Sequence, residues 1–218
     1  MKPTKEYNGR SRIRMFNMCC ESYMNACKEN RYELAIVDPP YGIDASRMTM
    51  GKGSGNDLKK HDTTKEWDSA VPSSDYFKSL KYVSENQIIW GGNYFDLPPS
   101  RCYLLWDKMD YNSDFASHEM AWTSFDQVVK CYRRARAKNG DNKNKVHPTQ
   151  KPVQLYKWLL TNYAKEGDTI LDTHGGSMSI AIACWDLGFD LDICELDTDY
   201  FNDAVKRFEQ HIAQAQLF

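Results

Sequence analysis

Residues 34–41 read Leu34-Ala35-Ile36-Val37-Asp38-Pro39-Pro40-Tyr41, a short apolar run that ends in an acid, two prolines and an aromatic residue. The run does not alternate with polar residues, which predicts a strand buried on both faces of a parallel sheet. Pro39 disfavours a helical conformation at Asp38, and neither proline has a backbone N–H, so the strand ends there. The carboxyl edge of an open parallel sheet, where ligands bind, would therefore present a carboxylate, a stiff carbonyl and a ring.

Such an edge suits a flat heterocycle with an amino group, because the carboxylate and the carbonyl both accept N–H hydrogen bonds and the ring can stack. A turn that ends a strand and leaves a tyrosine on the surface explains the same residues equally well. The rest of the chain has to distinguish these two interpretations.

Length and composition predict one α/β domain over residues 1–218. No apolar run is long enough to span a bilayer, and the polar first five residues do not resemble a signal peptide. The seven cysteines form no CxxC pair and no His/Cys ligand spacing. They indicate reduced thiols of a cytoplasmic protein, without a disulfide framework or a metal site.

The hydrophobic pattern predicts one doubly wound, mostly parallel sheet, without a repeat or a linker. Strands are expected over residues 12–18, 34–38, 87–90, 102–107, 119–124, 169–172 and 190–194, and helices over 20–30, 76–83, 153–163, 177–187 and 200–213. Residues 43–74 lack periodicity and are rich in glycine, lysine, aspartate and threonine, which is typical of a mobile lid or substrate loop.

Residues 130–147 concentrate positive charge on a chain whose net charge is −2. They hold seven lysines and arginines against one aspartate, so this segment carries +6 and the remainder −8. A solvated basic loop is the ordinary interpretation of such a run, and contact with a polyanion is the alternative.

The second half of the chain carries a nucleoside-binding pattern of strand, glycine turn, helix, strand and acid. Gly175-Gly176-Ser177 follows the strand that ends at Asp172, and Glu195 comes about 20 residues later, where an acid can accept hydrogen bonds from ribose hydroxyls. The spacing is incomplete for a pyrophosphate, so it favours a ligand with ribose but no phosphate. Asp172 is placed to meet an ammonium group. A glycine-started helix without a ligand is the alternative.

Three motifs occur in a diagnostic order: Asp38–Tyr41, then His147-Pro148-Thr149-Gln150-Lys151-Pro152, then Leu171–Ser177. In this order they resemble the S-adenosylmethionine-dependent amino-methyltransferases of DNA, in the circularly permuted β group whose catalytic motif precedes the cofactor turn. Gln87–Phe95 and Ala121–Phe125 also look like the phage and prophage members. The resemblance runs from about residue 12 to residue 208.

The resemblance implies roles for residues of each motif. Asp38 and the Pro39 carbonyl would accept the amine of a flipped base, Pro40 belongs to the same catalytic motif, and Tyr41 would stack on the base. The cofactor, S-adenosylmethionine, would contact Asp172, Gly175, Gly176, Ser177, Thr149, Lys151 and, on its ribose, Glu195. Cys19 stands where the family commonly has an acid near the adenine, and Met178 replaces the last glycine of the usual turn.

The implied partner is double-stranded DNA, with its backbone bound by cations of the basic loop. The expected DNA-binding residues are Lys130, Arg133, Arg134, Arg136 and Lys138, together with Asn93, which is either a turn residue or a wall of the site. The family often carries a larger recognition insert here. Specificity is therefore expected to be short, relaxed, or supplied by a second subunit or a homodimer partner.

The resemblance favours N6 of adenine, because the cytosine-N4 enzymes usually have serine in place of Asp38. It also implies the cytoplasm of a bacterial or phage-infected cell. Two alternatives stay open: an amino-methyltransferase acting on cytosine N4 or on RNA, and a nucleic-acid-binding partner subunit with the same fold and weakened catalysis. Met178 and Cys19 favour the partner subunit, and the intact Asp38–Tyr41 motif favours an enzyme.

Overall fold

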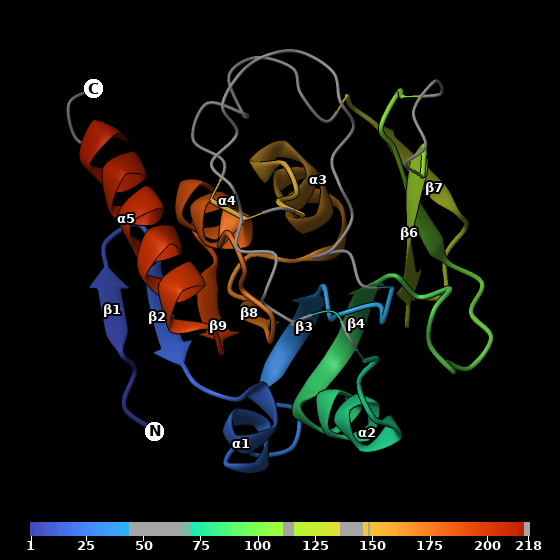
Figure 1. Cartoon of the computed structure of the whole chain (residues 1–218), viewed down its shortest axis with the longest axis horizontal. Helices are drawn as coiled ribbons and strands as arrows, with labels where there is room; N and C mark the ends of the chain where they lie inside the picture. Colours follow the sequence, from blue (N-terminus) through green and yellow to red (C-terminus); the bar gives the residue numbers. More distant parts are fainter. Residues whose placement is uncertain (44–67, 69, 111–115, 136–145, 148, 216–218) are drawn as a thin grey trace.

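A computed structural model describes residues 1–43, 68, 70–110, 116–135, 146–147 and 149–215. They form a nine-stranded sheet with helices on both faces (Figure 1). In spatial order the strands are β1 (Lys5–Asn8), β2 (Arg12–Asn17), β9 (Asp190–Glu195), β8 (Thr169–Asp172), β3 (Tyr32–Val37), β4 (Ser84–Trp90), β6 (His118–Thr123), β5 (Tyr103–Asp107) and β7 (Lys130–Arg133). The expectation of an α/β fold with a mostly parallel sheet is confirmed.

The five strands from β2 to β4 are mutually parallel, and β6 is antiparallel to both β4 and β5. From β3 the chain proceeds through α2 (Ser74–Val83) to β4 on one side. From β8 it proceeds through α4 (Ser179–Leu187) to β9 on the other side. The strand order therefore reverses between β8 and β3, and loops diverge from this point at the carboxyl edge of the sheet.

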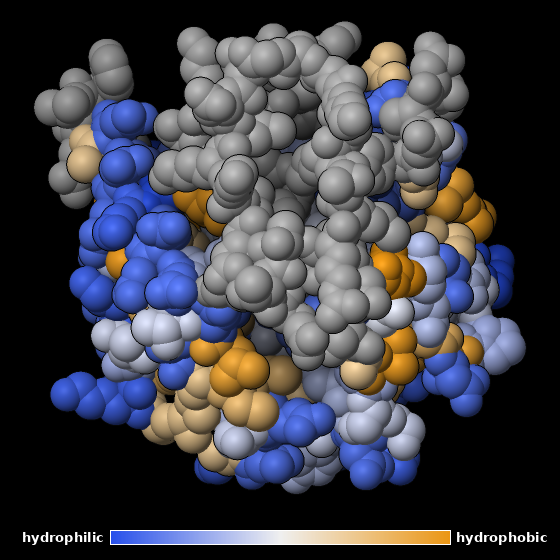
Figure 2. Space-filling model, viewed as in Figure 1, coloured by the Kyte–Doolittle hydropathy of each residue, from blue (hydrophilic) through white to orange (hydrophobic). Residues whose placement is uncertain are grey.

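The helices cover the sheet in two groups. One face carries α3 (Val153–Tyr163), α4 and α5 (Thr198–Ala215), whose apolar residues join the larger core cluster. The other face carries α1 (Cys20–Asn25) and α2, over a second cluster. Helix α5 buries Phe201, Ala204, Val205 and Phe208 at helical spacing, while its outer surface is polar (Figure 2). None of the helices in the described ranges combines the length and the apolar character needed to cross a membrane.

The structure differs from the expected elements at three places. Strand β1 was not expected; it pairs with β2 at the sheet edge. The first helix ends at Asn25 instead of residue 30, because the chain turns towards β3 through Asn30, whose φ is 46°. Residues 130–133, expected as the start of the basic loop, form β7, since pairing with β5 satisfies their backbone groups whatever their side-chain charge. Most of the expected lid at 43–74 lies outside the described residues.

A buried carboxylate ties four elements together beneath the second face of the sheet. Asp192 on β9, 2% exposed, accepts a hydrogen bond from Arg14 Nε on β2 at 2.6 Å. It also accepts hydrogen bonds from the hydroxyls of Tyr23 on α1 and Tyr32 on β3, at 2.7 and 2.6 Å. Burial disfavours the charge, but these donors outweigh it and lower the pKa of Asp192.

We expect Asp192→Ala to lower the free energy of unfolding by about 2–4 kcal/mol, because the Arg14 guanidinium and one of the two mutually hydrogen-bonded tyrosine hydroxyls lose their acceptor. Urea unfolding at pH 7 measures this. The matched control is Asp190→Ala on the same strand, whose pair with Arg12 is solvent-exposed and should contribute about 1 kcal/mol or less.

The pH dependence of this difference follows from the lowered pKa. The stabilisation by Asp192 is fully present above the ordinary aspartate pKa and is lost as the pH falls through the lower folded-state value. The difference between wild type and Asp192→Ala should therefore shrink below about pH 4. Equal losses for Asp192→Ala and Asp190→Ala would contradict a special role for the buried carboxylate.

Candidate active site

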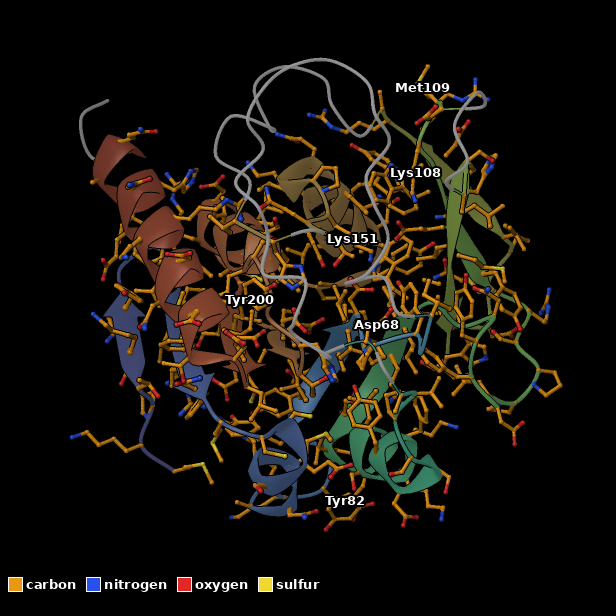
Figure 3. The ribbon with its side chains drawn as sticks, viewed as in Figure 1. Asp68, Tyr82, Lys108, Met109, Lys151 and Tyr200 are labelled. Carbon is orange, nitrogen blue, oxygen red and sulfur yellow. The ribbon has the colours of Figure 1, made fainter. Side chains whose placement is uncertain are left out.

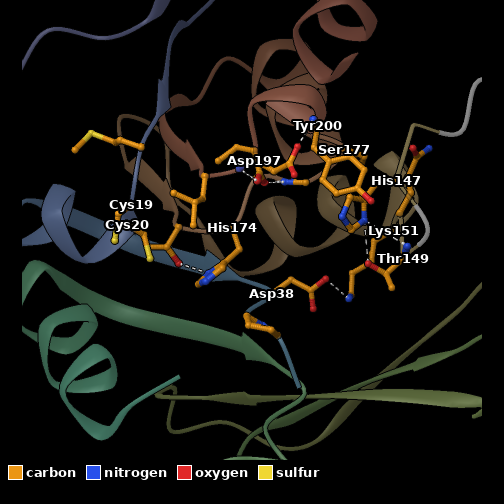
Figure 4. A pocket seen from close by; sticks show the side chains of 18 of the residues that line it. Cys19, Cys20, Asp38, His147, Thr149, Lys151, His174, Ser177, Asp197 and Tyr200 are labelled. Carbon is orange, nitrogen blue, oxygen red and sulfur yellow. Dashed lines mark hydrogen bonds and ion pairs between the residues drawn. The ribbon is translucent and has the colours of Figure 1, made fainter. Parts of the chain in front are cut away.

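A cavity of about 460 Å³ opens at the carboxyl edge of the sheet, beside the point where the strand order reverses (Figure 4). Its walls are residues that follow β2, β3, β8 and β9, together with the segment around residues 147–151. The volume is in the range of small-molecule sites. Segments far apart in the sequence meet here because parallel strands end at one edge.

Asp38 follows β3 directly and lines the cavity. Its Oδ2 lies 2.5 Å from Lys151 Nζ, and its Oδ1 accepts a hydrogen bond from the Tyr41 hydroxyl at 2.6 Å. Figure 4 shows Asp38 and Lys151 facing each other, joined by this contact. Both carboxylate oxygens are therefore engaged.

The Tyr41 ring is enclosed by residues that follow β4. It stacks on Tyr94, with ring centroids 5.0 Å apart and planes 12° from parallel. It also packs against Gly91, where a Cβ atom would come within 2.2 Å of the ring and where φ is 70°. Only glycine fits that position, so the backbone at the end of β4 is shaped around the tyrosine.

Asp68 anchors the turn after the two prolines. The side chain, 2% exposed, accepts hydrogen bonds from the backbone N–H groups of Tyr41 and Gly42 at 2.6 and 3.0 Å. Pro39 and Pro40 supply no donors, so these two N–H groups are the first after the prolines that need an acceptor. The Asp38–Tyr41 turn is held rigid by this carboxylate.

Lys151, expected to help hold a cofactor, lines the cavity and pairs with Asp38. Its ammonium lies between Asp38 and Glu119, 3.0 Å from Glu119 Oε2. Burial would lower the pKa of Lys151, but the two carboxylates reverse this effect and raise it. The lysine is a fixed cation beside Asp38.

The turn after β8 brings the backbone close to the cavity. A Cβ atom on Gly175 would lie 3.0 Å from the Ile193 side chain and 3.2 Å from the Cys194 carbonyl, so the turn needs glycine there. Met178 has a φ of 52°, in the left-handed region that favours glycine. Its side chain is fully buried, and this apolar contact offsets the strain.

Two acids flank this turn. Asp172 is 2% exposed, and burial raises its pKa to about 8, although the His174 N–H donates to it at 2.9 Å. Glu195 accepts N–H hydrogen bonds from Gly176 and Asp197 at 2.7 and 2.8 Å, and burial raises its pKa too. Each of these carboxyl groups can take a further polar partner from a ligand.

The remaining expected cofactor residues also lie at the cavity. Cys19, Thr149 and Ser177 line it. Thr149 Oγ1 lies 3.1 Å from His147 Nδ1, and the His147 ring contacts Tyr200 at 4.5 Å between centroids. The described part of the chain thus brings the expected cofactor residues to the cavity, except for Asp172, which lies behind the lining residue Thr173.

A family model described as DNA methylase, of the N6/N4 type, matches residues 87–206, more than half of the chain. The chain belongs to this DNA methylase family. The activity is methyl transfer to an exocyclic amine of DNA, N6 of adenine or N4 of cytosine.

Solved structures show the same fold. The chain is similar to the cytosine-N4-specific PvuII DNA methyltransferase at 12% identity and a TM-score of 0.62, covering 97% of this chain and 92% of that one. It is similar to M1.HpyAVI in complex with S-adenosylmethionine at 14% identity and a TM-score of 0.57, covering 89% and 99%. A putative DNA modification methylase from Thermus thermophilus matches at 16% identity and a TM-score of 0.53, covering 92% and 95%.

The expected DNA-binding residues of this methylase are spread more widely than a single loop. Arg133, at the carboxyl end of β7, pairs with Asp107 at 2.9 Å, and Arg134 follows it. Lys130 is at the other end of β7, with its ammonium over the Tyr163 ring. Asn93 is exposed beyond β4. Arg136 and Lys138 lie outside the described residues.

Sequence reasoning missed three residues of the site: Asp68, Tyr94 and Glu119. Asp68 stands in the segment interpreted as a loop, and Glu119 in a strand whose pattern gives no hint of an ion pair with a distant lysine. Tyr94 lies within a motif of the family resemblance that suggests no role for it. For Asp68 and Glu119 we find no local signal, because only the tertiary structure brings their partners near.

We expect Asp172→Asn to stabilise the free protein at pH 8 and above. A buried acid with a raised pKa is protonated in the folded state but ionised in the unfolded state between about pH 4 and pH 8, so wild-type stability falls as the pH rises through this window. The uncharged amide avoids this loss. Urea unfolding of both proteins at pH 4 and pH 8.5 measures it, and an equal difference at both pH values would contradict it.

Proposed function

We propose that this methylase transfers a methyl group from S-adenosylmethionine to N6 of a flipped adenine in double-stranded DNA. The observation that carries the proposal is Asp38, an acceptor at the edge of the cavity, opposite the turn after β8. An aspartate there favours adenine within the family resemblance. Because the Asp38–Tyr41 motif precedes the cofactor turn, we assign the chain to the permuted β group.

S-adenosylmethionine is the cofactor, and the cavity residues fit it. When bound, it supplies an electrophilic methyl group on a sulfonium. Asp172 is a buried acid that forms no ion pair within the described part of the chain, and it would pair with the ammonium group of the methionine end. Glu195 would accept hydrogen bonds from the ribose hydroxyls, and Gly175 permits close approach of the ligand to the backbone.

Asp38 and the Pro39 carbonyl act on the amine. The lone pair of an aromatic amine is delocalised into the ring, so the nitrogen is a poor nucleophile. Two acceptors that hold its N–H groups favour a pyramidal nitrogen and direct the lone pair to the methyl group, and both stand on a rigid turn. As the new N–C bond forms, the nitrogen loses one proton, for which the Asp38 carboxylate is the nearest acceptor.

Tyr41 has to change partners for the base to bind. Its hydroxyl now occupies Oδ1 of Asp38, and its ring is stacked on Tyr94. The incoming amine replaces the hydroxyl on Oδ1, and the base stacks on one of the two rings. A base inserted between them would separate them to about twice the stacking distance, which the exposed Tyr94, at 43%, can accommodate by moving outward.

Two observations favour alternative functions, which the experiments described next distinguish from the proposal. The PvuII structure, which is similar to this chain, is that of a cytosine-N4-specific enzyme. The strained Met178 in the cofactor turn is the feature expected of a partner subunit with weakened catalysis. We expect sequence recognition to be short or relaxed, or to be supplied by a second copy or another subunit.

We expect wild-type protein incubated with mixed DNA and methyl-labelled cofactor to place label in N6-methyladenine. Asp38→Ala should reduce transfer to background, because the amine loses its anionic acceptor. The protein should stay folded and still gain thermal stability from S-adenosylmethionine, since Asp38 does not hold the cofactor. Nucleoside analysis of digested DNA and a thermal-shift titration give these two readings.

Asp126→Ala, which removes an exposed carboxylate paired with Arg101, is the matched control and should keep wild-type activity. Label in N4-methylcytosine, or only in RNA, would overturn the adenine proposal and leave the fold assignment intact. Near-normal turnover by Asp38→Ala would show that the active site has been misplaced.

We expect DNA affinity to depend steeply on salt through the basic segment. If four of its cations contact phosphates, the slope of log association constant against log salt should be about −3.6, from roughly −0.9 per contact. Alanine at Arg133, Arg134 and Arg136 together should flatten the slope and weaken all sequences alike. Lys28→Ala, in the turn after α1, is the control. An unchanged slope would contradict the assignment of this segment to DNA-backbone binding. Loss of discrimination between DNA sequences would show that the segment contacts bases.

A further inference from the structure

A chain of alternating charges begins at Asp38. Lys151 Nζ lies 2.5 Å from Asp38 Oδ2 and 3.0 Å from Glu119 Oε2, and Glu119 Oε1 lies 2.7 Å from Lys108 Nζ. The two lysine side chains are 3% and 6% exposed. In Figure 3, Lys151 lies near the centre of the molecule and Lys108 lies towards β6 and β7.

The topology explains how these residues meet. Strands β3 and β5 end at the same edge of the sheet, and β6 begins there because it is antiparallel. Lys108 follows β5, Glu119 is the second residue of β6, and Trp106 on β5 pairs with Glu119 in register. The antiparallel strand thus places an acid beside the ends of the parallel ones.

Aromatic rings enclose the cations. The Lys151 ammonium lies 5.3 Å from the centroid of Trp90, and Lys108 lies 5.6 Å from that of Trp106. Charges in such surroundings are stabilised only by close counter-charges. The two carboxylates and two ammonium groups balance, so removal of any one of them leaves an uncompensated charge beside the reacting centre.

We propose, on the basis of the function proposed above, that Glu119 and Lys108 are positioning residues for methyl transfer: they hold the Lys151 ammonium between two carboxylates, so that Asp38 stays an anionic acceptor with Oδ1 directed at the substrate amine. Glu119 and Lys108 do not line the cavity and act through Lys151. Lys151 itself is not a base, since its neighbours keep it protonated.

Further titratable groups stand near Lys151 and Asp38 on neighbouring elements. Asp38 and Tyr41 face Lys151 from the end of β3, Tyr156 stands on α3, and Asp172 lies at the end of β8. Lys151 and Lys108 together lower the pKa of Glu119 to about 2 against the effect of burial. Glu119 is thus ionised at neutral pH.

The test begins with two variants that unbalance the chain in opposite directions. Glu119→Gln leaves Lys151 with one carboxylate, so kcat at saturating DNA and cofactor should fall about tenfold or more. In the pH profile of kcat, the decrease at alkaline pH should begin at a lower pH than in wild type. Lys108→Met leaves two carboxylates sharing one ammonium, so the acid limb of kcat should move to higher pH. The KM for the cofactor should change by less than about threefold in both.

The double variant Glu119→Gln/Lys108→Met restores the balance with only Asp38 and Lys151. It should recover most of the lost kcat and return both the acid and the alkaline sides of the pH profile of kcat towards wild type. The two substitutions would then be strongly coupled in a double-mutant cycle. Losses that add in the double variant, without displaced limbs in the single variants, would overturn the proposal. They would show that Glu119 and Lys108 serve only to pack this end of the sheet.

A measurement without DNA separates this proposal from the proposed function. In protein with ¹³C-labelled lysine, the Lys151 signal is assigned by its absence in Lys151→Met, and its titration is compared between wild type and Glu119→Gln. A lower pKa of Lys151 in Glu119→Gln supports the charge chain even if wild type methylates no DNA. An unchanged titration overturns the proposal even if wild type proves to be an adenine methylase.

Discussion

The arrangement of the whole site depends on the reversal of strand order between β8 and β3. Parallel strands end at one edge, and at the reversal their loops leave in opposite directions and open a cavity. Asp38, Asp172 and Glu195 each follow or end a different strand; Asp38 and Glu195 line the same 460 Å³ space, and Asp172 directly precedes Thr173, which lines it too. The acceptor that we propose for the substrate and the acids that we propose for the cofactor are therefore close together before any ligand binds.

Two buried carboxylates of this protein, Asp192 and Asp172, have opposite pKa shifts because they have different numbers of hydrogen-bond donors. Asp192 has three donors, its charge is favoured, and it binds β2, β3, β9 and α1 to one another. Asp172 has one backbone donor, and burial raises its pKa to about 8. A carboxylate with several donors contributes stability, whereas one with a single donor destabilises the free protein at a pH that ionises it, which fits the cation-binding role that we propose for Asp172.

Asp38 is satisfied in a third manner, by two groups of which a substrate can displace only one. Tyr41 holds one oxygen of Asp38 and Lys151 holds the other. The lysine is fixed by Glu119, while the tyrosine is fixed through its backbone by Asp68 and through its ring by Tyr94. The hydroxyl contact is the one that can be exchanged for an amine without unpairing a buried charge, which assigns a different task to each oxygen.

The sequence by itself determined the central strand, its end at the prolines, the glycine turn after β8 and the order of the motifs, because each depends on the local chemistry of a few neighbouring residues. It therefore also indicated Asp38, Asp172 and Glu195, and the fold class. The tertiary structure decided that Lys151 faces Asp38, that Glu119 and Lys108 continue the charge chain, that Asp68 anchors the turn, and that residues 130–133 extend the sheet. The physical reason is distance along the chain: Asp68 stands 26 residues from Gly42 and Lys151 stands 113 residues from Asp38, and only the packing of the sheet brings such partners within hydrogen-bond reach.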